Sequence, residues 1–410
     1  MSGTDRTAVI TGLGVVAPTG LDTAAFWRSA LAGVDGVGRI TRFDPARYPV
    51  RRAGEVVGFD PRSSVEARVL VQTDLWTHFA LAATQQALTE AALDPAAGSG
   101  FEIGVTTSAS SGGNAFGQRE IEALWARGPR FVGPYQSIAW FYAASTGQIS
   151  INRGLRGPCA VVSSEAAGGL DALGHSRGVI RAGGRVQVTG GTEAPVSPYA
   201  LTCQLKSDLL STSDYRPFSR HARGYLPGEG GAVLVVEEAG HAAARGARPL
   251  ARIAGHAATF AGPPGDGVGW TRGADAVAAA IRFALADADI SATQVDAVFA
   301  DGMGVPAADA AEVAGLRAAL GPRAARVPVT AVKAGLGRAY SGAAALEATA
   351  AVLALRDGLV PPTPGLAAAD VDHDIDLVTG GARAADLRHV LVLARGYGGF
   401  TSALVLAAAG

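Results

Sequence analysis

The chain has 410 residues, of which 48% are hydrophobic and only 17% are charged, and its net charge is −1. This balance, without any run of basic residues, excludes electrostatic binding of nucleic acid or of an anionic membrane surface. Two cysteines are too few for a disulfide framework. No apolar leader precedes the first predicted strand. Charged residues or glycine interrupt every apolar run before it is long enough for a transmembrane helix. We therefore expect a soluble cytoplasmic protein of two or three domains or two fused halves, with part of its surface covered by a partner.

The first predicted strand is the β-branched run at residues 8–12. The segment 12–17, which contains Gly12 and Gly14 and ends in alanine, formally matches the GxGxxG/A pattern of dinucleotide-binding proteins. Pro18 interrupts the helix that would bind the phosphates, and Asp22 is better placed to cap a helix over residues 23–32. We therefore expect no dinucleotide site at this end of the chain.

The segment 157–171 is typical of a buried strand, a tight turn and a helix rich in small residues. Enzymes present a nucleophile in this way, because the dipole at a helix N-terminus stabilises a thiolate. The residue at the tip of the turn is Ala166, which has no nucleophilic or titratable group. The sequence therefore predicts that no covalent intermediate forms there.

The other reactive side chains have simpler interpretations. Cys159 lies in the predicted strand and is expected to be a buried, inert thiol. Cys203 lies in a predicted loop at 199–205 without a base beside it. The seven histidines have no metal-ligand spacing, and His175 is interpreted as a hydrogen-bonding residue on a helix surface.

A weak internal repeat relates two predicted helices rich in small residues, at 168–183 and 342–358. Each ends at a glycine and leads to a later strand. Gly168 and Gly169 lie inside the first helix, where a glycine costs about 1 kcal/mol relative to alanine, so we expect a neighbouring backbone to approach them closely. The repeat predicts an α/β protein of two similar halves, with these helices packed at its centre.

Several motifs together carry a family resemblance. Ile10-Thr11-Gly12-Leu13-Gly14, Arg216-Pro217-Phe218-Ser219 and Gly396-Tyr397-Gly398-Gly399-Phe400 resemble the signatures of β-ketoacyl synthases of the thiolase superfamily. The segments 116–120 and 135–142 resemble the chain-length factor, the ketosynthase β subunit of bacterial type II aromatic polyketide synthases. The resemblance implies a thiolase-like fold, with two pseudo-repeated α/β halves (1–250 and 251–410) whose mixed five-stranded sheets are layered α-β-α-β-α. A tunnel-lining and interface insertion is expected at about 110–150.

The resemblance also implies where catalytic residues would lie. Active ketosynthases use a cysteine, two histidines and a nearby lysine. The cysteine position falls on Ala166 and the histidine positions on Asp301 and Arg338, so that only Lys333 is retained. Alanine cannot be acylated, an aspartate opposes the negative charge of an enolate, and an arginine cannot act as a base. We therefore expect a catalytic site that is silent, in a chain not active alone, with Lys333, Asp301 and Arg338 forming a structural ionic cluster.

The residue at the cysteine position also departs from the subfamily. Chain-length factors commonly carry a glutamine there, which has been credited with decarboxylating malonyl units. Here Glu165 is followed by Ala166, which argues against a priming decarboxylase. Two acidic residues downstream of the first histidine position, Asp309 and Glu312, match the family pattern.

The helix that matches 114–125 lines a tunnel in chain-length factors, and its bulk limits the length of the product. The matching inward positions are Asn114, Gly117 and Ile121, spaced so that they share one helical face. Because an interior helical glycine costs stability and gains only space, Gly117 predicts a roomy tunnel, suited to a chain longer than an octaketide. The alternative is a glycine retained for close helix packing.

The resemblance implies several partners. An active ketosynthase α subunit would form a heterodimer with this chain through the central strands and a region that includes Tyr135, Trp140 and Phe141. An acyl carrier protein would deliver malonyl units on phosphopantetheine to a growing poly-β-ketone, and no resident cofactor or metal is implied. Two alternatives stay open: an independent malonyl-carrier-protein decarboxylase that uses Lys333 and ordered water, and a scaffold that only stabilises the partner.

Overall fold

Two sheets with the same strand order form the framework of the chain. The computed structural model describes residues 6–262 and 269–409. Each half has five main strands. When these are numbered 1 to 5 along the chain within each half, they lie side by side in the order 3-2-4-5-1. The four successive neighbouring pairs are parallel, parallel, antiparallel and antiparallel. The internal repeat predicted from two helices is therefore confirmed as a repeat of whole α/β halves. The strands of the first half are β1 (Ala8–Val16), β4 (Ile103–Ser108), β5 (Cys159–Val162), β6 (Val186–Glu193) and β7 (Gly230–Glu238); those of the second are β8 (Ala251–Phe260), β9 (Ala297–Phe299), β10 (Pro328–Thr330), β14 (His389–Arg395) and β15 (Phe400–Ala408).

The two sheets are joined at one edge. Val9 of β1 pairs with Arg252 of β8, and Ile10 pairs with Ala251, so the described strands form one continuous order of eleven. The eleventh is β12 (Asp376–Leu377), a short sixth strand of the second half that lies beside β10. Two further pairs of short strands lie outside this sheet: β2 (Gly38–Arg39) with β3 (Arg52–Ala53), and β11 (Leu359–Val360) with β13 (Arg383–Ala384).

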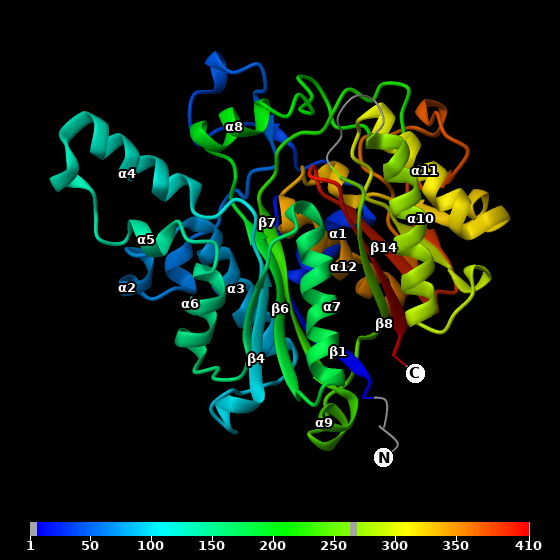
Figure 1. Ribbon diagram of the computed structural model, residues 1–410, viewed down its shortest axis with the longest axis horizontal. Helices are drawn as coiled ribbons and strands as arrows, with labels where there is room; N and C mark the ends of the chain where they lie inside the picture. Colours follow the sequence, from blue (N-terminus) through cyan, green and yellow to red (C-terminus); the bar gives the residue numbers. More distant parts are fainter. Residues whose placement is uncertain (1–5, 263–268, 410) are drawn as a thin grey trace.

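The helices complete the expected layering, as Figure 1 shows. Helices α7 (Gly168–Arg181) and α12 (Tyr340–Asp357) contact strands of both halves and form the central layer. Helices α3 (Leu75–Glu90) and α6 (Ala144–Arg153) cover the outer face of the first half, and α10 (Gly269–Asp287) and α11 (Pro306–Leu320) cover that of the second. Within residues 6–262 and 269–409, none of the helices is both long and apolar enough to cross a bilayer. The remaining helices are α1 (Thr23–Leu31), α2 (Ala67–Leu70), α4 (Asn114–Arg127), α5 (Gln136–Ala139), α8 (Pro198–Leu205) and α9 (Ala239–Ala244).

Small residues allow the two central helices to approach closely. A Cβ atom added to Gly169 of α7 would lie 2.3 Å from the carbonyl oxygen of Ser341 in α12. Every residue of α12 from Ser341 to Leu355 is buried, as expected of a helix surrounded by protein on all sides. The predicted close backbone approach at this glycine is confirmed.

The first strand is longer than expected, because its glycines continue it. Strand β1 runs to Val16, and Cβ atoms added to Gly12 and Gly14 would lie 2.1 and 1.8 Å from carbonyl oxygens of α3. These glycines therefore bring a helix against the strand, where a dinucleotide site would need a turn into a phosphate-binding helix. The capping prediction is confirmed: Asp22 accepts a hydrogen bond from the backbone N–H of Ala25 (2.7 Å) in the first turn of α1.

A projecting segment between β4 and β5 interrupts the layers. We call residues 114–142, which contain α4 and α5, the arm. In Figure 1 helix α4 extends away from the five layers at the left of the view. The arm thus presents its side chains outside the main body of the chain.

Candidate functional site

Ala166 lies at a sharp turn between a strand and the central helix α7. The chain leaves β5 at Val162, makes a short 3₁₀ turn over Glu165–Ala167 and enters α7 at Gly168. Glu165 has φ +52°, a left-handed conformation that is strained for a residue with a side chain. The predicted strand–turn–helix is therefore present, and the residue at its tip is a buried alanine.

The two cysteines differ from their expected surroundings. Cys159 lies in a strand, as predicted, but its expected burial is wrong, because β5 is the edge strand of the sheet. Cys203 lies in helix α8, where a loop was expected, and is also exposed. His175 is exposed on α7, as the sequence predicted.

The structure brings the four positions implied by the family resemblance to one place. Ala166, Asp301, Lys333 and Arg338 line the same narrow gap, which is too small to hold a water molecule. The gap is completed by the central helix α12 and the end of β14, through Tyr340, Ala343, Ala344 and Ala394. Residues from both halves of the chain therefore meet at the N-termini of the two central helices.

Ion pairs fill this site. Arg338 Nη1 lies 3.0 Å from Asp301 Oδ2, and Lys333 Nζ lies 3.6 Å from Asp301 Oδ1. Lys333 Nζ also lies 3.4 Å from Glu347 Oε1 and donates to the backbone carbonyls of Ala300 (3.2 Å) and Asp301 (3.0 Å). Lys333, Asp301 and Arg338 are all buried, so the three charged groups form the ionic cluster that the sequence predicted.

The surroundings favour the charged forms of Asp301 and Arg338. Burial by itself raises the pKa of Asp301, but the positive charges of Arg338, Lys333 and Arg395 outweigh it and hold that pKa below its usual value. Burial by itself lowers the pKa of Arg338, but Asp301 and other neighbours raise it well above the ordinary range. Arg338 therefore stays protonated and cannot accept a proton.

The two downstream acidic residues hold the loop that carries Asp301. Glu312 accepts hydrogen bonds from the backbone N–H groups of Asp301 (2.6 Å) and Gly302 (2.9 Å). Asp309 accepts from those of Gly304 (2.9 Å) and Phe218 (2.8 Å). Both carboxyl groups bind backbone and therefore shape the site without facing its gap.

Sequence reasoning missed the side chain of Glu165. Its Oε2 atom accepts hydrogen bonds from the backbone N–H of Ala166 (2.5 Å) and from that of Tyr397 (3.1 Å). Burial raises the pKa of this carboxyl, although the positive charge of Arg338 opposes the shift. The only sequence signal was a carboxyl residue directly before the nucleophile position; the glycine turn that supplies Tyr397 lies 232 residues away.

The three residues of the expected tunnel face of α4 have different surroundings in this chain. The side-chain amide of Asn114 donates to the carbonyls of Ser111 (3.0 Å) and Gly112 (3.3 Å), so it stabilises the start of the helix. A Cβ atom on Gly117 would lie 3.4 Å from the Trp140 ring, so this glycine packs against an aromatic side chain. Ile121 is 37% exposed because α4 projects from the body. Within this chain alone the three residues do not enclose a tunnel. A Cβ on Gly117 would make only ordinary contact with Trp140, so close packing does not require a glycine there.

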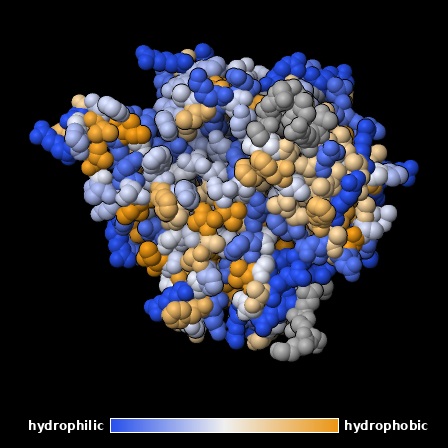
Figure 2. Space-filling model, in the orientation of Figure 1, coloured by the Kyte–Doolittle hydropathy of each residue, from blue (hydrophilic) through white to orange (hydrophobic). Residues whose placement is uncertain are grey.

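The arm carries an exposed apolar surface, which we call the aromatic face. Trp140 and Phe141 are 49% and 51% exposed, and Trp125 is 82% exposed. Figure 2 shows orange, hydrophobic side chains gathered over the arm. Large exposed apolar patches mark interaction surfaces, and Tyr135, a further predicted interface residue, is also exposed here. The members of this face are Ile121, Leu124, Trp125, Phe131, Tyr135, Ile138, Trp140, Phe141 and Tyr142.

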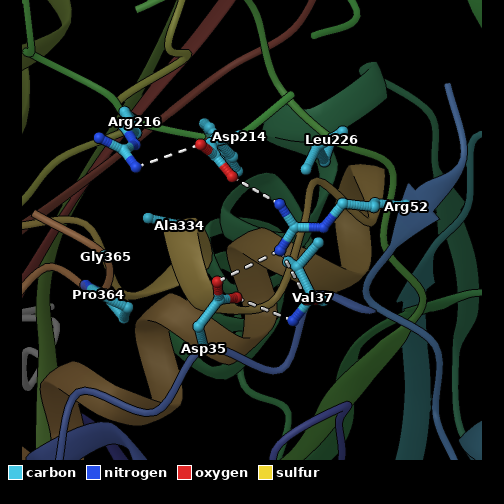
Figure 3. Close-up of a pocket in the computed structure, with 10 residues that line it drawn as sticks. Asp35, Val37, Arg52, Asp214, Arg216, Leu226, Ala334, Pro364 and Gly365 are labelled. Atoms are coloured by element: carbon cyan, nitrogen blue, oxygen red, sulfur yellow. Dashed lines mark hydrogen bonds and ion pairs between the residues drawn. The ribbon is translucent and has the colours of Figure 1, made fainter. Parts of the chain in front are cut away.

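A separate surface pocket of about 50 Å³ lies close to this site, and its lining includes Ala334, the residue after Lys333. Figure 3 shows that its charged side chains are paired with one another. Arg52 lies between Asp214 (2.5 Å) and Asp35 (3.8 Å), and Arg216 lies 3.2 Å from Asp214. Two arginines facing two aspartates leave no net charge to select an ionic ligand, so the pocket is not the candidate site.

The sequence matches two family models that together cover most of the chain. The β-ketoacyl synthase N-terminal domain matches residues 5–242, and the β-ketoacyl synthase C-terminal domain matches residues 250–367.

Relatives from Streptomyces match along nearly the whole length. The tetracenomycin polyketide synthase ketoacyl synthase beta subunit of Streptomyces glaucescens is 47% identical over 405 residues, covering 97% of each chain. In Streptomyces halstedii, a chain named polyketide beta-ketoacyl synthase 2 is 52% identical over 407 residues and covers 98% of this chain and 97% of its own. The polyketide beta-ketoacyl synthase 1 of the same organism is 35% identical over 416 residues, covering 98% of each chain. The chain is therefore more similar to the second type than to the first.

Solved structures agree with these relatives. The ishigamide ketosynthase/chain length factor superposes with a TM-score of 0.92 at 28% identity, covering 99% of this chain and 100% of that one. A type II PKS acyl-carrier protein in complex with its ketosynthase bound to the hexaketide gives a TM-score of 0.87 at 27% identity, with the same coverage. The chain has the thiolase-like ketosynthase fold and belongs to the β-ketoacyl synthase family.

Proposed function

We propose that this chain is the catalytically silent, chain-length-determining subunit of a type II polyketide synthase. One observation carries the proposal: at the positions where active family members hold a cysteine and two histidines, this chain has Ala166, Asp301 and Arg338, and the last two are paired with each other. An intact ion pair now occupies the place of an acid–base pair. The greater similarity to beta subunits than to a synthase of the first type supports the same role.

The geometry removes each step of carbon–carbon bond formation. Ala166 offers no atom that could carry an acyl group. Asp301 places a negative charge where an enolate would develop, and like charges raise the energy of such an intermediate. Lys333 is engaged with two carbonyls and two carboxylates, which leaves it no free role as the base of a decarboxylase.

An active ketosynthase α subunit is the proposed partner, as in the ketosynthase/chain length factor that this chain resembles. The aromatic face of the arm would be buried against it. Strand β5 offers a second contact, because it is the open edge of the sheet and presents unpaired backbone groups. An interface that covers both would be apolar and would bury about 2,000 Å² or more, as obligate heterodimers do.

The partner would carry the acylated cysteine. An acyl carrier protein would bring malonyl units on its phosphopantetheine arm, and the growing poly-β-ketone would occupy a tunnel that forms between α4 and the partner. The space beside Gly117 and Trp140 would then influence product length. No resident cofactor or metal is part of the proposal, and the complex would work in the cytoplasm.

A reconstitution tests this function. Product length and carbon dioxide release are measured for this chain alone, for its ketosynthase partner alone and for the pair, each supplied with malonyl-loaded acyl carrier protein. The proposal expects full-length product from the pair only. Full-length product from the partner alone contradicts the specificity role, and carbon dioxide release by this chain alone favours an independent decarboxylase.

A further inference from the structure

Two backbone N–H groups converge on a single oxygen atom at the silent site. Glu165 Oε2 accepts from Ala166 N at 2.5 Å and from Tyr397 N at 3.1 Å. One donor belongs to the residue at the nucleophile position, and the other belongs to the glycine turn between β14 and β15. Every residue except proline keeps its backbone N–H, so this pair of donors is present although the reactive side chains are absent.

Such a pair of donors has a known chemical use. Acyl transfer passes through a tetrahedral intermediate whose oxygen is negatively charged, and enzymes stabilise it with preorganised backbone N–H groups beside the nucleophile. Tyr397 N lies at the distance from which such donors serve an oxyanion, and Ala166 N lies closer still. A carboxyl oxygen of the chain itself therefore occupies the place where the oxygen of an acyl group would bind.

The surroundings are shaped around this carboxyl group. A Cβ atom on Gly396 would lie 2.9 Å from Glu165 Oε2 and 3.0 Å from Glu165 Cβ, so the absence of a side chain there makes room for it. The Glu165 carbonyl accepts from Ser110 Oγ (3.0 Å), which helps to hold the backbone in its left-handed conformation. Three independent features thus hold the carboxyl group in this position: the two donors, the glycine and the anchored turn.

We propose that Glu165 closes this site to acyl groups, because its carboxyl oxygen occupies the donor pair that an acyl oxyanion needs. The inference deepens the silent role proposed above and rests on it. It adds that the loss of the cysteine is only one of two blocks, so that restoring a thiol alone leaves acyl transfer slow.

The test compares acylation with alkylation of an introduced thiol. The full-length chain carries Cys159→Ser and Cys203→Ser, because both native cysteines are exposed, together with Ala166→Cys. Acylation uses p-nitrophenyl acetate: the thiolate sulfur attacks the carbonyl carbon, an oxyanion forms, and p-nitrophenolate leaves with the electron pair to give an acetyl thioester. Alkylation uses iodoacetamide, in which sulfur displaces iodide at a saturated carbon without an oxyanion. Intact-mass spectrometry follows both reactions and separates this chain from any bound partner.

The measured quantity is the rate of acylation divided by the rate of alkylation. Changes in access to the thiol affect both rates and therefore cancel in this ratio. Adding Glu165→Ala frees both donors and is expected to raise the ratio on the order of 100-fold, the scale of an oxyanion-stabilising donor. Adding Glu165→Gln keeps an acceptor oxygen on the donors while it removes the charge, so the ratio should stay within a few-fold of Ala166→Cys alone.

Three results would overturn the proposal. If Glu165→Ala and Glu165→Gln raised the ratio equally, the carboxylate would block acylation by repelling the oxyanion and not by occupying the donors. No increase for Glu165→Ala would show that the donor pair does not serve an acyl oxyanion. A thiol that neither reagent reaches in any variant would show that other groups close the site. None of these results bears on product length or pairing, which the reconstitution measures separately.

Discussion

Arg338 Nη1 lies 3.0 Å from Asp301 Oδ2, and both side chains are buried at the centre of the chain. By the family resemblance, these residues occupy the two positions that hold histidines in active ketosynthases. A pair that would exchange protons has been replaced by a pair with fixed opposite charges. Removing one member of a buried pair leaves its partner charged and unsolvated, which costs more than the pair contributes. The pair that we propose to have replaced an acid–base pair is therefore expected to be important for stability.

Asp301→Asn should destabilise the chain by about 3–5 kcal/mol, because Arg338 and Lys333 lose their shared negative charge. Urea unfolding measures the change in the free energy of unfolding. Asp374→Asn is the matched control: its ion pair with Arg317 is solvent-exposed, so its loss should cost less than about 1 kcal/mol. Equal effects of the two substitutions would contradict the structural role of the cluster.

Stability should fall on acidification because of His78. This side chain is buried beside Thr73 Oγ1 (3.0 Å), and burial, followed by the positive charge of Arg119, lowers the pKa of His78 to about 4. The unfolded chain binds this proton near pH 6.5 and the folded chain only near pH 4, so the contribution is complete above 6.5 and is lost as the pH falls through that window. A shift of this size corresponds to roughly 3 kcal/mol.

Urea midpoints measured from pH 7.5 to 4 check this prediction. The difference in stability between the unmodified chain and His78→Gln should change across the window from pH 6.5 to 4. Substitution of the exposed His221 by glutamine should leave the slope in place. An unaltered slope in His78→Gln would assign the acid sensitivity to other groups.

Gly169→Ala should destabilise the chain, because its Cβ would lie 2.3 Å from Ser341 O and force the central helices apart. Overpacking of this kind costs about 1–3 kcal/mol. Gly178 lies in the same helix with no atom within 4 Å of an added Cβ, so Gly178→Ala should gain up to about 1 kcal/mol from helix propensity. Urea unfolding should therefore show a lower free energy of unfolding for Gly169→Ala and a higher one for Gly178→Ala.

Gly117→Phe should shorten the polyketide made by the complex by at least one two-carbon unit. The added ring would lie against Trp140 and push bulk toward the proposed tunnel. The control is Glu122→Phe, which adds the same ring at an exposed position of α4. Mass spectrometry of the products, with heterodimer formation checked by size-exclusion chromatography, decides between the tunnel and packing roles. Unchanged product length from an intact complex would leave Gly117 as a packing residue.

Phe141→Asp should weaken binding to the ketosynthase partner at least about 30-fold, because aromatic side chains at the centre of an interface contribute 2 kcal/mol or more. Dissociation constants from sedimentation or surface plasmon resonance measure this effect. Phe283 is another exposed phenylalanine, on α10 in the other half of the chain, and Phe283→Asp should leave the affinity unchanged. Similar losses from both variants would place the interface elsewhere.

Two features of the fold could be predicted from sequence: the division into two halves, from an internal repeat, and the start of a helix, from a capping residue. The paired small-residue helices indicated two similar halves, and Asp22 indicated where α1 begins. The extension of β1 through Gly12 and Gly14 could not be predicted, because these glycines pack against helix α3, which begins more than 60 residues later. Burial of Cys159 was predicted wrongly for a similar reason, since only the strand order shows that β5 is an edge.

The sequence by itself determined what chemistry is missing: alanine at 166 has no nucleophile and arginine at 338 accepts no proton, whatever the fold around them. Only the tertiary structure decided what fills the site instead. It places Tyr397 N, from a turn 232 residues away, on the Glu165 carboxyl, and it turns α4 outward so that Ile121 is exposed. The lack of a nucleophilic atom is a property of a single side chain, whereas contact, burial and pKa depend on which distant segments the sheets bring together.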